Sequence, residues 1–402
     1  MKTERAATKN TAAALIVETV EKRSQMTEFI RMPYSIYRDD KNWTPPLEAD
    51  VRKTLDPRKH PFLEFGKVKL FLARRADRVV GRIAAVVDPR FNEYHGTNYG
   101  FFGFFECIDD IDVARALFEA AEDYLDAYGF ETVIGPMSYS TNYDCGILVS
   151  GFDVHPGVMM PHNPEYYPRL LEECGFRKEK DLWSWDIPMQ EDCVAPAEAV
   201  FADKILQNGK DTRSRSDITV RPMDFKHYDA DLAKLRKIYC SAWSDNWGFV
   251  PTTNNEFQYM GKQLKPLMKP EFALIAEFNG QPVATAIAFF DPGPALRAAR
   301  GRMTRFGLPI GLFHLLRADK TARRLRFILL GIVAEHRYPG LAPMMIEDVY
   351  RAAYRLGYRD PMEGSWILEN NRGLNRLIED LGGILVRKHR IYSRAMHRTR
   401  GA

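Results

Sequence analysis

A six-residue loop in the C-terminal half has the composition of an anion-binding turn. The loop, residues 337–342, reads RYPGLA and lies between an apolar run, residues 324–334, and a helical pattern that begins near Pro343. Successive backbone N–H groups of such a loop, together with the positive end of the following helix, can hold a diphosphate. Gly340 would allow close approach of the backbone, and proline suits a first helical turn. The alternative is a plain turn between a strand and a helix.

The elements around this loop occur twice along the chain. Residues 272–290 read as a β-hairpin, followed by a third strand, a helix of about fifteen residues, a short strand and a helix that ends at Gly382. Residues 69–175 show the same series in the same order. Similar tags, Asn42-Trp43 and Asn246-Trp247, precede the two series at an offset of about 204 residues. This repetition predicts an internal duplication, with two unrelated α/β domains as the alternative.

The length of 402 residues suits two domains. We predict an α+β fold of two tandem halves, each a mixed, mostly antiparallel sheet flanked by helices. The predicted halves are residues 14–187 and 218–398, joined by a linker at 188–217. The formal net charge is only +4, so anion binding has to come from local clusters of charge.

The five cysteines form no CxxC pair and have no histidine at metal-ligand spacing. We therefore predict reduced core thiols and no metal site. The N-terminal apolar run is too short for a signal sequence, and no later stretch is apolar over about eighteen residues. We expect a cytoplasmic protein.

Several segments resemble the GNAT (Gcn5-related N-acetyltransferase) superfamily. The RYPGLA loop matches its (Gln/Arg)-x-x-Gly-x-(Gly/Ala) pattern, and EGSWILENN at 363–371 resembles its following strand and helix start. The two tags, GPMSYSTNYDCG at 135–146 and PEYYPRLLEECGF at 164–176 are similar to segments of a bacterial double-GNAT family of acyltransferases. One group of that family is implicated in ceramide synthesis.

The resemblance implies an N-acyltransferase that uses acyl-CoA and an amine acceptor, such as a lipid or sphingoid-base amine. In GNAT proteins the pantetheine arm pairs with a splayed strand, and the pyrophosphate lies on the loop. A GNAT-fold binding or regulatory protein without turnover is the alternative. The residues expected to bind acyl-CoA are Gly331, Ile332, Val333, Arg337, Tyr338, Gly340, Leu341, Ala342 and Asn371.

The general acid of many GNAT members is absent. Their last helix carries a tyrosine four residues before its closing glycine, where this chain has Ile378 and, in the first half, Leu171. The acceptor amine, whose ordinary pKa is about 10, must still lose a proton. Glu335 and His336, at the end of the expected splayed strand, are the candidates for this role. The alternative for His336 is a solvated loop histidine.

The N-terminal half has no counterpart of the diphosphate loop. Residues 108–112 read IDDID at that place, and three carboxylates would repel a diphosphate. We therefore expect this half to shape the acceptor site or to stabilise the fold. Its segment 135–146 is dense in hydroxyls and amides, which often line pockets, although a self-satisfied turn network is the alternative.

Residues 295–326 form the most basic stretch of the chain, and its cations alternate with apolar residues. This composition suits contact with anionic lipid at the inner face of a membrane. The alternatives are a clamp for CoA phosphates and a loop packed on its own domain. No recognised motif accompanies the stretch, so we expect no nucleic-acid binding.

Overall fold

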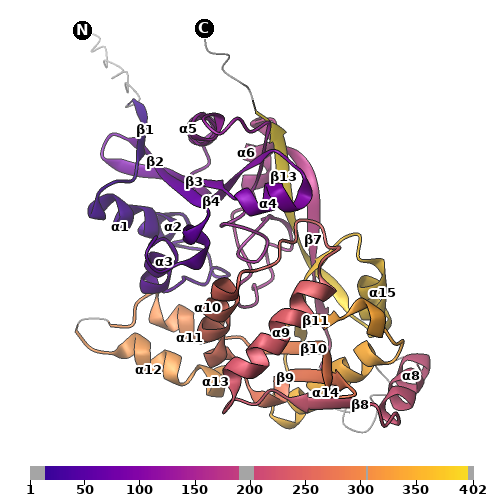
Figure 1. The fold of residues 1–402 in the computed structure, drawn as a ribbon. Helices are drawn as coiled ribbons and strands as arrows, with labels where there is room; N and C mark the ends of the chain where they lie inside the picture. The colour runs from indigo at the N-terminus through magenta and orange to yellow at the C-terminus, as the bar shows by residue number, and fades with distance from the viewer. Residues whose placement is uncertain (1–13, 190–202, 305–306, 397–402) are drawn as a thin grey trace, which may run out of the picture.

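The computed structural model describes residues 14–189, 203–304 and 307–396 (Figure 1). The strands of these residues form one thirteen-stranded sheet in the order β1-β2-β3-β4-β5-β13-β7-β12-β11-β10-β9-β8, with β6 beside β13. The strands are β1 (Leu15–Thr19), β2 (Lys67–Arg75), β3 (Arg78–Val87), β4 (Tyr99–Cys107), β5 (Thr132–Gly135), β6 (Ile147–Ser150), β7 (Arg177–Ile187), β8 (Ile218–Pro222), β9 (Ala273–Phe278), β10 (Gln281–Phe290), β11 (Leu325–Ile332), β12 (Met362–Leu368) and β13 (Ile384–Ala395).

The two halves repeat one series of elements, as the sequence predicts. The β2–β3 and β9–β10 hairpins are each extended by an antiparallel third strand, β4 or β11. A long helix, α5 (Ile111–Asp126) or α14 (Leu341–Arg355), then leads to a parallel strand, β5 or β12. The second helices are α6 (Tyr167–Glu173) and α15 (Arg372–Asp380). The predicted α+β class is therefore confirmed.

The last strand of each half pairs with the sheet of the other half. Strand β7 lies beside β12, and β13 lies beside β5. The two strands also pair with each other in antiparallel register, from Ile384 opposite Asp186 to Ser393 opposite Arg177. Figure 1 shows them running between the N-terminal elements at the top and the C-terminal elements below. The halves proposed from the sequence repeat thus share one continuous sheet.

Apolar spacing explains how the two long helices are fixed on the sheet. Helix α5 buries Val113, Leu117 and Phe118 at the three- and four-residue spacing of one helical face. Helix α14 buries Met345 and Val349 in the same way. Each half consequently has a core in which a long helix covers one face of its hairpin strands.

The other helices lie before the hairpins, between β3 and β4, or between β10 and β11. Residues 190–202 of the predicted linker lie outside the described residues, and the linker continues as α8 (Asp203–Arg213). Helices α11 (Gly293–Ala299), α12 (Ile310–Leu316) and α13 (Ala318–Thr321) form the connection from β10 to β11. The remaining helices are α1 (Arg23–Arg31), α2 (Pro33–Ile36), α3 (Glu48–Thr54), α4 (Pro89–His95), α9 (Tyr228–Ala242) and α10 (Asn254–Leu264).

Four of the five cysteines lie within the described residues, and all four are free thiols. Cys107, Cys145 and Cys174 are buried, and Cys240 is half-buried. Cys193 lies outside the described residues. The prediction of reduced thiols in the core thus agrees with the structure at three positions.

Candidate functional site

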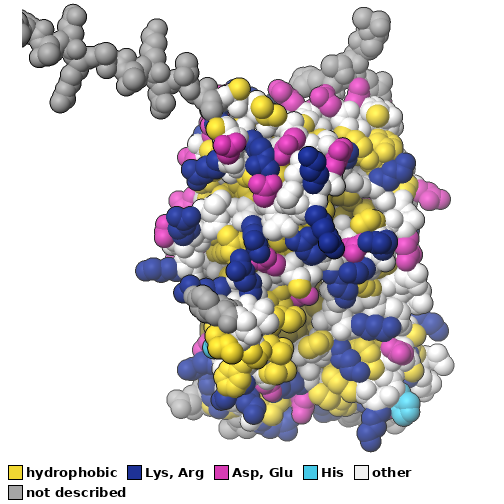
Figure 2. Space-filling view, turned by 90° about the vertical axis from the view of Figure 1, so that its left-hand side faces the viewer, with side chains coloured by type: hydrophobic (Ala, Val, Ile, Leu, Met, Phe, Trp, Pro, Cys, Tyr) yellow, Lys and Arg dark blue, Asp and Glu magenta, His cyan; other side chains and the backbone are white. Residues whose placement is uncertain are grey.

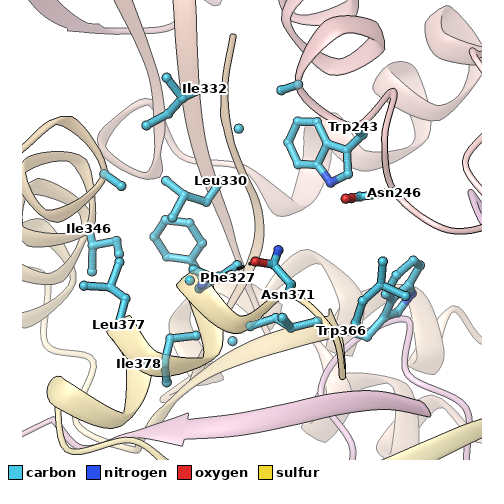
Figure 3. A pocket seen from close by; sticks show the side chains of 18 of the residues that line it. Trp243, Asn246, Phe327, Leu330, Ile332, Ile346, Trp366, Asn371, Leu377 and Ile378 are labelled. Atoms are coloured by element: carbon cyan, nitrogen blue, oxygen red, sulfur yellow. Dashed lines mark hydrogen bonds between the residues drawn. The ribbon is translucent and has the colours of Figure 1, made fainter. Parts of the chain in front are cut away.

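The central feature of the C-terminal half is an opening between two parallel strands. Strands β11 and β12 pair only at Arg326 opposite Glu363 and at Phe327 opposite Gly364, and they diverge beyond these pairs. A cavity of about 600 Å³ fills the opening, and we call it the donor cavity. Figure 3 shows Leu330 and Ile332 of β11 within it. The splayed strand expected from the sequence is thus present in β11.

The edge of β11 that faces the donor cavity is free to pair with a ligand. Its other edge is paired with β10, from Ile332 opposite Ala284 to Leu325 opposite Phe290. A β-carbon at Gly331 would come within 2.1 Å of the Trp243 ring, so only glycine allows this close approach of α9 to the strand. An extended ligand chain could therefore add to β11 as a further strand, between Trp243 and the apolar floor.

The predicted diphosphate loop lies at the rim of the donor cavity. Arg337, Tyr338 and Ala342 line the cavity, and Gly340 is the N-cap residue of α14. The first N–H groups of a helix have no intrahelical partner, so this helix end can hold an anion. The exposed Arg337 supplies a positive charge beside it. The arrangement suits a diphosphate at the rim with an extended arm inside.

Gly340 also has a structural role that the sequence did not reveal. A β-carbon at Gly340 would come within 1.9 Å of the Asn208 carbonyl oxygen and 2.1 Å of the Thr212 hydroxyl oxygen, both on α8. The linker helix α8 therefore packs directly on the start of α14. Substitution of Gly340 would displace α8, so this position cannot serve as a clean test of diphosphate binding.

Of the remaining residues predicted to bind acyl-CoA, one lines the donor cavity and others lie around it. Asn371 lines the cavity and caps α15, where its side-chain oxygen accepts a hydrogen bond from the Leu374 N–H at 3.3 Å. Val333 continues the pairing with β10 through a hydrogen bond from its N–H to the Val283 carbonyl at 2.9 Å. Leu341 is fully buried below the loop. Ile378, at the place of the tyrosine expected of GNAT members, lies in the apolar floor.

A second cavity occupies the corresponding place in the N-terminal half, and we call it the acceptor cavity. Strands β4 and β5 pair in parallel from Tyr99 opposite Thr132 to Phe101 opposite Ile134 and then diverge. A space of about 410 Å³ lies beyond this pairing. Trp43 of the first tag lines it, as Trp247 of the second tag lines the donor cavity. The sequence analysis identified both tags as parts of a repeat but did not predict that they line a site.

An intrinsic carboxylate occupies the anion position of the N-terminal half. Asp110 caps α5, and its side chain accepts hydrogen bonds from the N–H groups of Asp112 and Val113. Its carboxylate also lies 2.7 Å from the Arg75 guanidinium. The helix end that would hold a diphosphate is therefore already neutralised, as the IDDID sequence predicts.

A third, smaller cavity of about 170 Å³ lies between the other two. It shares Trp243, Trp366 and Ser365 with the donor cavity. It shares Asp144 and Met159 with the acceptor cavity. The three spaces thus form a series that runs from one half of the protein to the other.

Comparison with known proteins identifies the family. No family model matches the chain. Protein YghO of Escherichia coli (strain K12) is 32% identical over 382 residues, which cover 94% of this chain and 95% of YghO. The bacterial ceramide synthase of Caulobacter vibrioides is 32% identical over 394 residues, which cover 96% and 99%. The chain belongs to the family of these two proteins.

Solved structures show that this chain has the tandem GNAT fold. A tandem GNAT protein from the clavulanic acid biosynthesis pathway matches 96% of this chain and all of its own, with a TM-score of 0.57 at 10% identity. A GCN5-related N-acetyltransferase from Sphaerobacter thermophilus matches 96% of both chains, with a TM-score of 0.51 at 14% identity. The resemblance stated from the sequence is confirmed, and the chain has the tandem GNAT fold.

The two residues predicted as bases lie outside the lining of the donor cavity. Glu335 and His336 belong to a 3₁₀ turn, Ala334–His336, that follows β11. Glu335 is exposed, and the His336 ring packs against Phe278 with 4.9 Å between ring centroids. Their catalytic role in this double-GNAT protein stays a prediction.

A buried ionic cluster lies at the short β11–β12 pairing, next to the donor cavity. The Glu363 carboxylate lies 2.9 Å from the Arg387 guanidinium and 3.2 Å from that of Arg324, and it accepts a hydrogen bond from the Ser365 hydroxyl at 2.7 Å. Burial alone would raise the pKa of Glu363, but the guanidinium charges outweigh it and hold the pKa below its ordinary value. Because Arg387 belongs to β13 and Glu363 to β12, the cluster ties the exchanged strand β13 to the C-terminal half.

Proposed function

We propose that this protein transfers an acyl group from acyl-CoA to the primary amine of an amphipathic lipid, such as a sphingoid base. The observation that carries the proposal is the donor cavity: a free strand edge on β11 ends at an anion-binding loop at the start of α14. The strand edge suits the amide groups of pantetheine, and the loop with Arg337 suits the pyrophosphate.

The apolar lining supports a fatty acyl group as the cargo. Ile346 and Leu377 form one wall of the donor cavity, and the third cavity adds Leu232, Phe257 and Met260. Such side chains hold a hydrocarbon chain because its burial is worth about 0.8 kcal/mol for each CH₂ group. The name of the Caulobacter vibrioides relative supports the acceptor, because a ceramide is the N-acyl derivative of a sphingoid base.

An exposed apolar surface on the α11–α13 region supports a lipid acceptor. Figure 2 shows hydrophobic side chains gathered there beside Lys and Arg side chains. Phe313 is 56% exposed and Leu316 is 73% exposed. A group of neighbouring exposed apolar side chains is typical of a surface that contacts another protein or a membrane. The exposed apolar residues of this lipid-facing surface are Met303, Leu308, Ile310, Leu312, Phe313 and Leu316.

Only part of the basic stretch 295–326 contributes charge to this surface. Arg324 and Arg326 turn inward, and Arg326 is 3% exposed. Arg305 and Phe306 lie outside the described residues. The exposed cations are Arg300, Arg302, Arg317, Lys320 and Arg323. Within the described residues, no helix is long and apolar enough to cross a bilayer. We therefore propose peripheral contact with an anionic membrane.

Vesicles that contain anionic lipid should bind the protein, and Phe313→Ser with Leu316→Ser should weaken this binding at both low and high salt. Reversal of Arg300, Arg317 and Lys320 to Glu should weaken it at low salt only, because each cation near the surface contributes up to about 1 kcal/mol that salt screens. Co-sedimentation measures both effects. Ile16→Ser removes an equally exposed apolar side chain on β1 and should change nothing. Wild-type protein that ignores anionic vesicles at low salt would contradict this proposal.

The function itself is tested by incubating the purified protein with palmitoyl-CoA and sphinganine. The proposal predicts release of free CoA thiol that depends on both substrates. A protein that binds acyl-CoA without any amine-dependent release would instead be a regulatory member of the fold.

A further inference from the structure

The acceptor cavity has the build of a GNAT donor site that has lost its affinity for diphosphate. It lies where β4 and β5 diverge, as the donor cavity lies where β11 and β12 diverge. Asp110 fills the anion position at the start of α5. Leu296 and Gly293 of α11 line the cavity, so it adjoins the helices that carry the lipid-facing surface. A lipid amine can therefore reach it from that side without meeting the bound donor.

Asp144 lies at the point where the acceptor cavity meets the third cavity. The residue lines both spaces. The third cavity continues to Ser365 and Trp366, which also line the donor cavity just beyond the last β11–β12 pair. A thioester held in the opening beside β11 and an amine held in the acceptor cavity would consequently approach each other near this carboxylate.

The backbone around Asp144 fixes the residue while its carboxylate is left free. The Asp144 carbonyl accepts a hydrogen bond from the Ser138 N–H at 2.8 Å, and Met137 pairs with Cys145 as an isolated bridge. Among the described residues, no hydrogen bond or ion pair reaches the side-chain oxygens of Asp144. This segment is therefore a rigid turn that presents an unpartnered carboxylate to a cavity.

Buried carboxylates elsewhere around these cavities have partners. Glu106 accepts hydrogen bonds from the hydroxyls of Tyr37 at 2.8 Å and Tyr167 at 2.7 Å. Asp291 accepts one from the Gly293 N–H at 2.8 Å. Asp144 differs from these two carboxylates, because its residue is exposed and its side-chain oxygens have no protein partner among the described residues. Its carboxylate is therefore available to a ligand in the cavities.

The surroundings of Asp144 make its carboxylate a stronger base than usual. The residue is open to the cavities, and partial desolvation by the surrounding protein raises the pKa of Asp144 above its ordinary value of 3.8. The Arg326 guanidinium of β11 opposes the rise. Arg326 itself is held by the Ser365 hydroxyl, to which its Nε donates at 2.9 Å. Across the acceptor cavity the charged or titratable groups are Tyr37, Asp50, Arg82, Glu106, Cys145, His162, Tyr167 and Asp291, and across the third cavity they are Tyr143, Tyr239 and Arg326.

We propose that Asp144 is the catalytic base that deprotonates an amine bound in the acceptor cavity, so that the N-terminal half supplies a reacting group to the donor bound in the C-terminal half. This inference rests on the proposed acyl transfer. The ammonium group gives one proton to the Asp144 carboxylate, and the free amine attacks the thioester carbonyl carbon. The N–C bond forms, the C–S bond breaks, and the nitrogen's second proton passes through water to the leaving thiolate. Asp144 then returns its proton to solvent.

Asp144→Asn keeps the size of the side chain and removes the base. With palmitoyl-CoA and sphinganine at neutral pH, we expect turnover to fall at least about 100-fold, while the affinity for palmitoyl-CoA is unchanged. Asp144→Glu should recover part of the rate. Asp123→Asn makes the same chemical change at an exposed position of α5 and should match the wild type.

The pH profile distinguishes a base from a merely structural residue. A carboxyl with a raised pKa is protonated below that pKa, so the wild-type rate should fall as pH drops through it and should level off above it. The Asn variant should lose this limb, and its rate should rise about tenfold for each pH unit toward the amine pKa of about 10. A wild-type profile in the folded Asn variant, or loss of the limb in Glu335→Gln or His336→Ala instead, would overturn the role of Asp144. Wild-type protein that never acylates the amine would instead overturn the proposed function.

Discussion

Ala342→Glu is expected to abolish acyl-CoA binding while the protein stays folded. Ala342 lies in the first turn of α14 and lines the rim of the donor cavity. A carboxylate there suits the helix dipole, as Asp110 does at the start of α5, but it would occupy the place of the pyrophosphate. Two unit charges about 4 Å apart repel by about 4 kcal/mol at an effective dielectric constant of about 20. Calorimetric titration with palmitoyl-CoA should show at least about a 100-fold loss of affinity.

The matched control for this change is Ala342→Gln, which adds nearly the same volume without the charge. We expect its affinity loss to be at least about tenfold smaller than that of the Glu variant, a difference of about 1.4 kcal/mol. For both variants, the urea concentration at the midpoint of unfolding should equal or exceed that of the wild type. Unchanged affinity in Ala342→Glu would place the diphosphate somewhere other than this helix end.

Glu363→Leu should destabilise the protein by about 3 kcal/mol or more, because it leaves buried guanidiniums without their carboxylate. Glu363 and Arg387 are both fully buried, and Arg387 lies 2.9 Å from Glu363. The Gly157 N–H also donates to Glu363 at 3.0 Å, so a loop of the N-terminal half loses its anchor as well. Urea denaturation followed by far-UV circular dichroism measures the change in the free energy of unfolding.

A double-variant cycle shows whether the charge pair is the cause. Arg387→Met removes the buried cation, so Glu363→Leu with Arg387→Met should be more stable than the sum of the two single changes predicts. The coupling should be largest between these two positions, which join β12 to β13. A free energy of unfolding in Glu363→Leu within about 0.5 kcal/mol of wild type would contradict the structural role of the cluster.

The sequence predicted local elements well because their signals are local. The hairpin turns, the third strands and the faces of α5 and α14 follow from polar turn residues and apolar spacing. The exchange of β7 and β13 could not be predicted in this way. Pairing between Ile384 and Asp186 joins residues about 198 positions apart, and nothing in either strand marks its partner.

The outline of the donor cavity was predictable for the same reason. Its loop is contiguous in sequence, and Gly331, Arg337 and Ala342 all line the cavity. The contact of Gly340 with α8 was not predictable, because it joins the loop to a helix that precedes it by more than a hundred residues. Asp144 stood in a segment recognised as polar, but only the meeting of the acceptor cavity and the third cavity singles it out.

The most direct test of acyl transfer is to count products from palmitoyl-CoA and sphinganine supplied together in anionic vesicles. Thiol release is followed with a chromogenic disulfide, and the N-palmitoyl product is quantified by mass spectrometry in the same samples. We predict equal amounts of free thiol and amide, with neither formed by Ala342→Glu. Thiol release without amide, or no release of thiol by the wild-type protein over a panel of acyl-CoA chain lengths, would contradict the assignment.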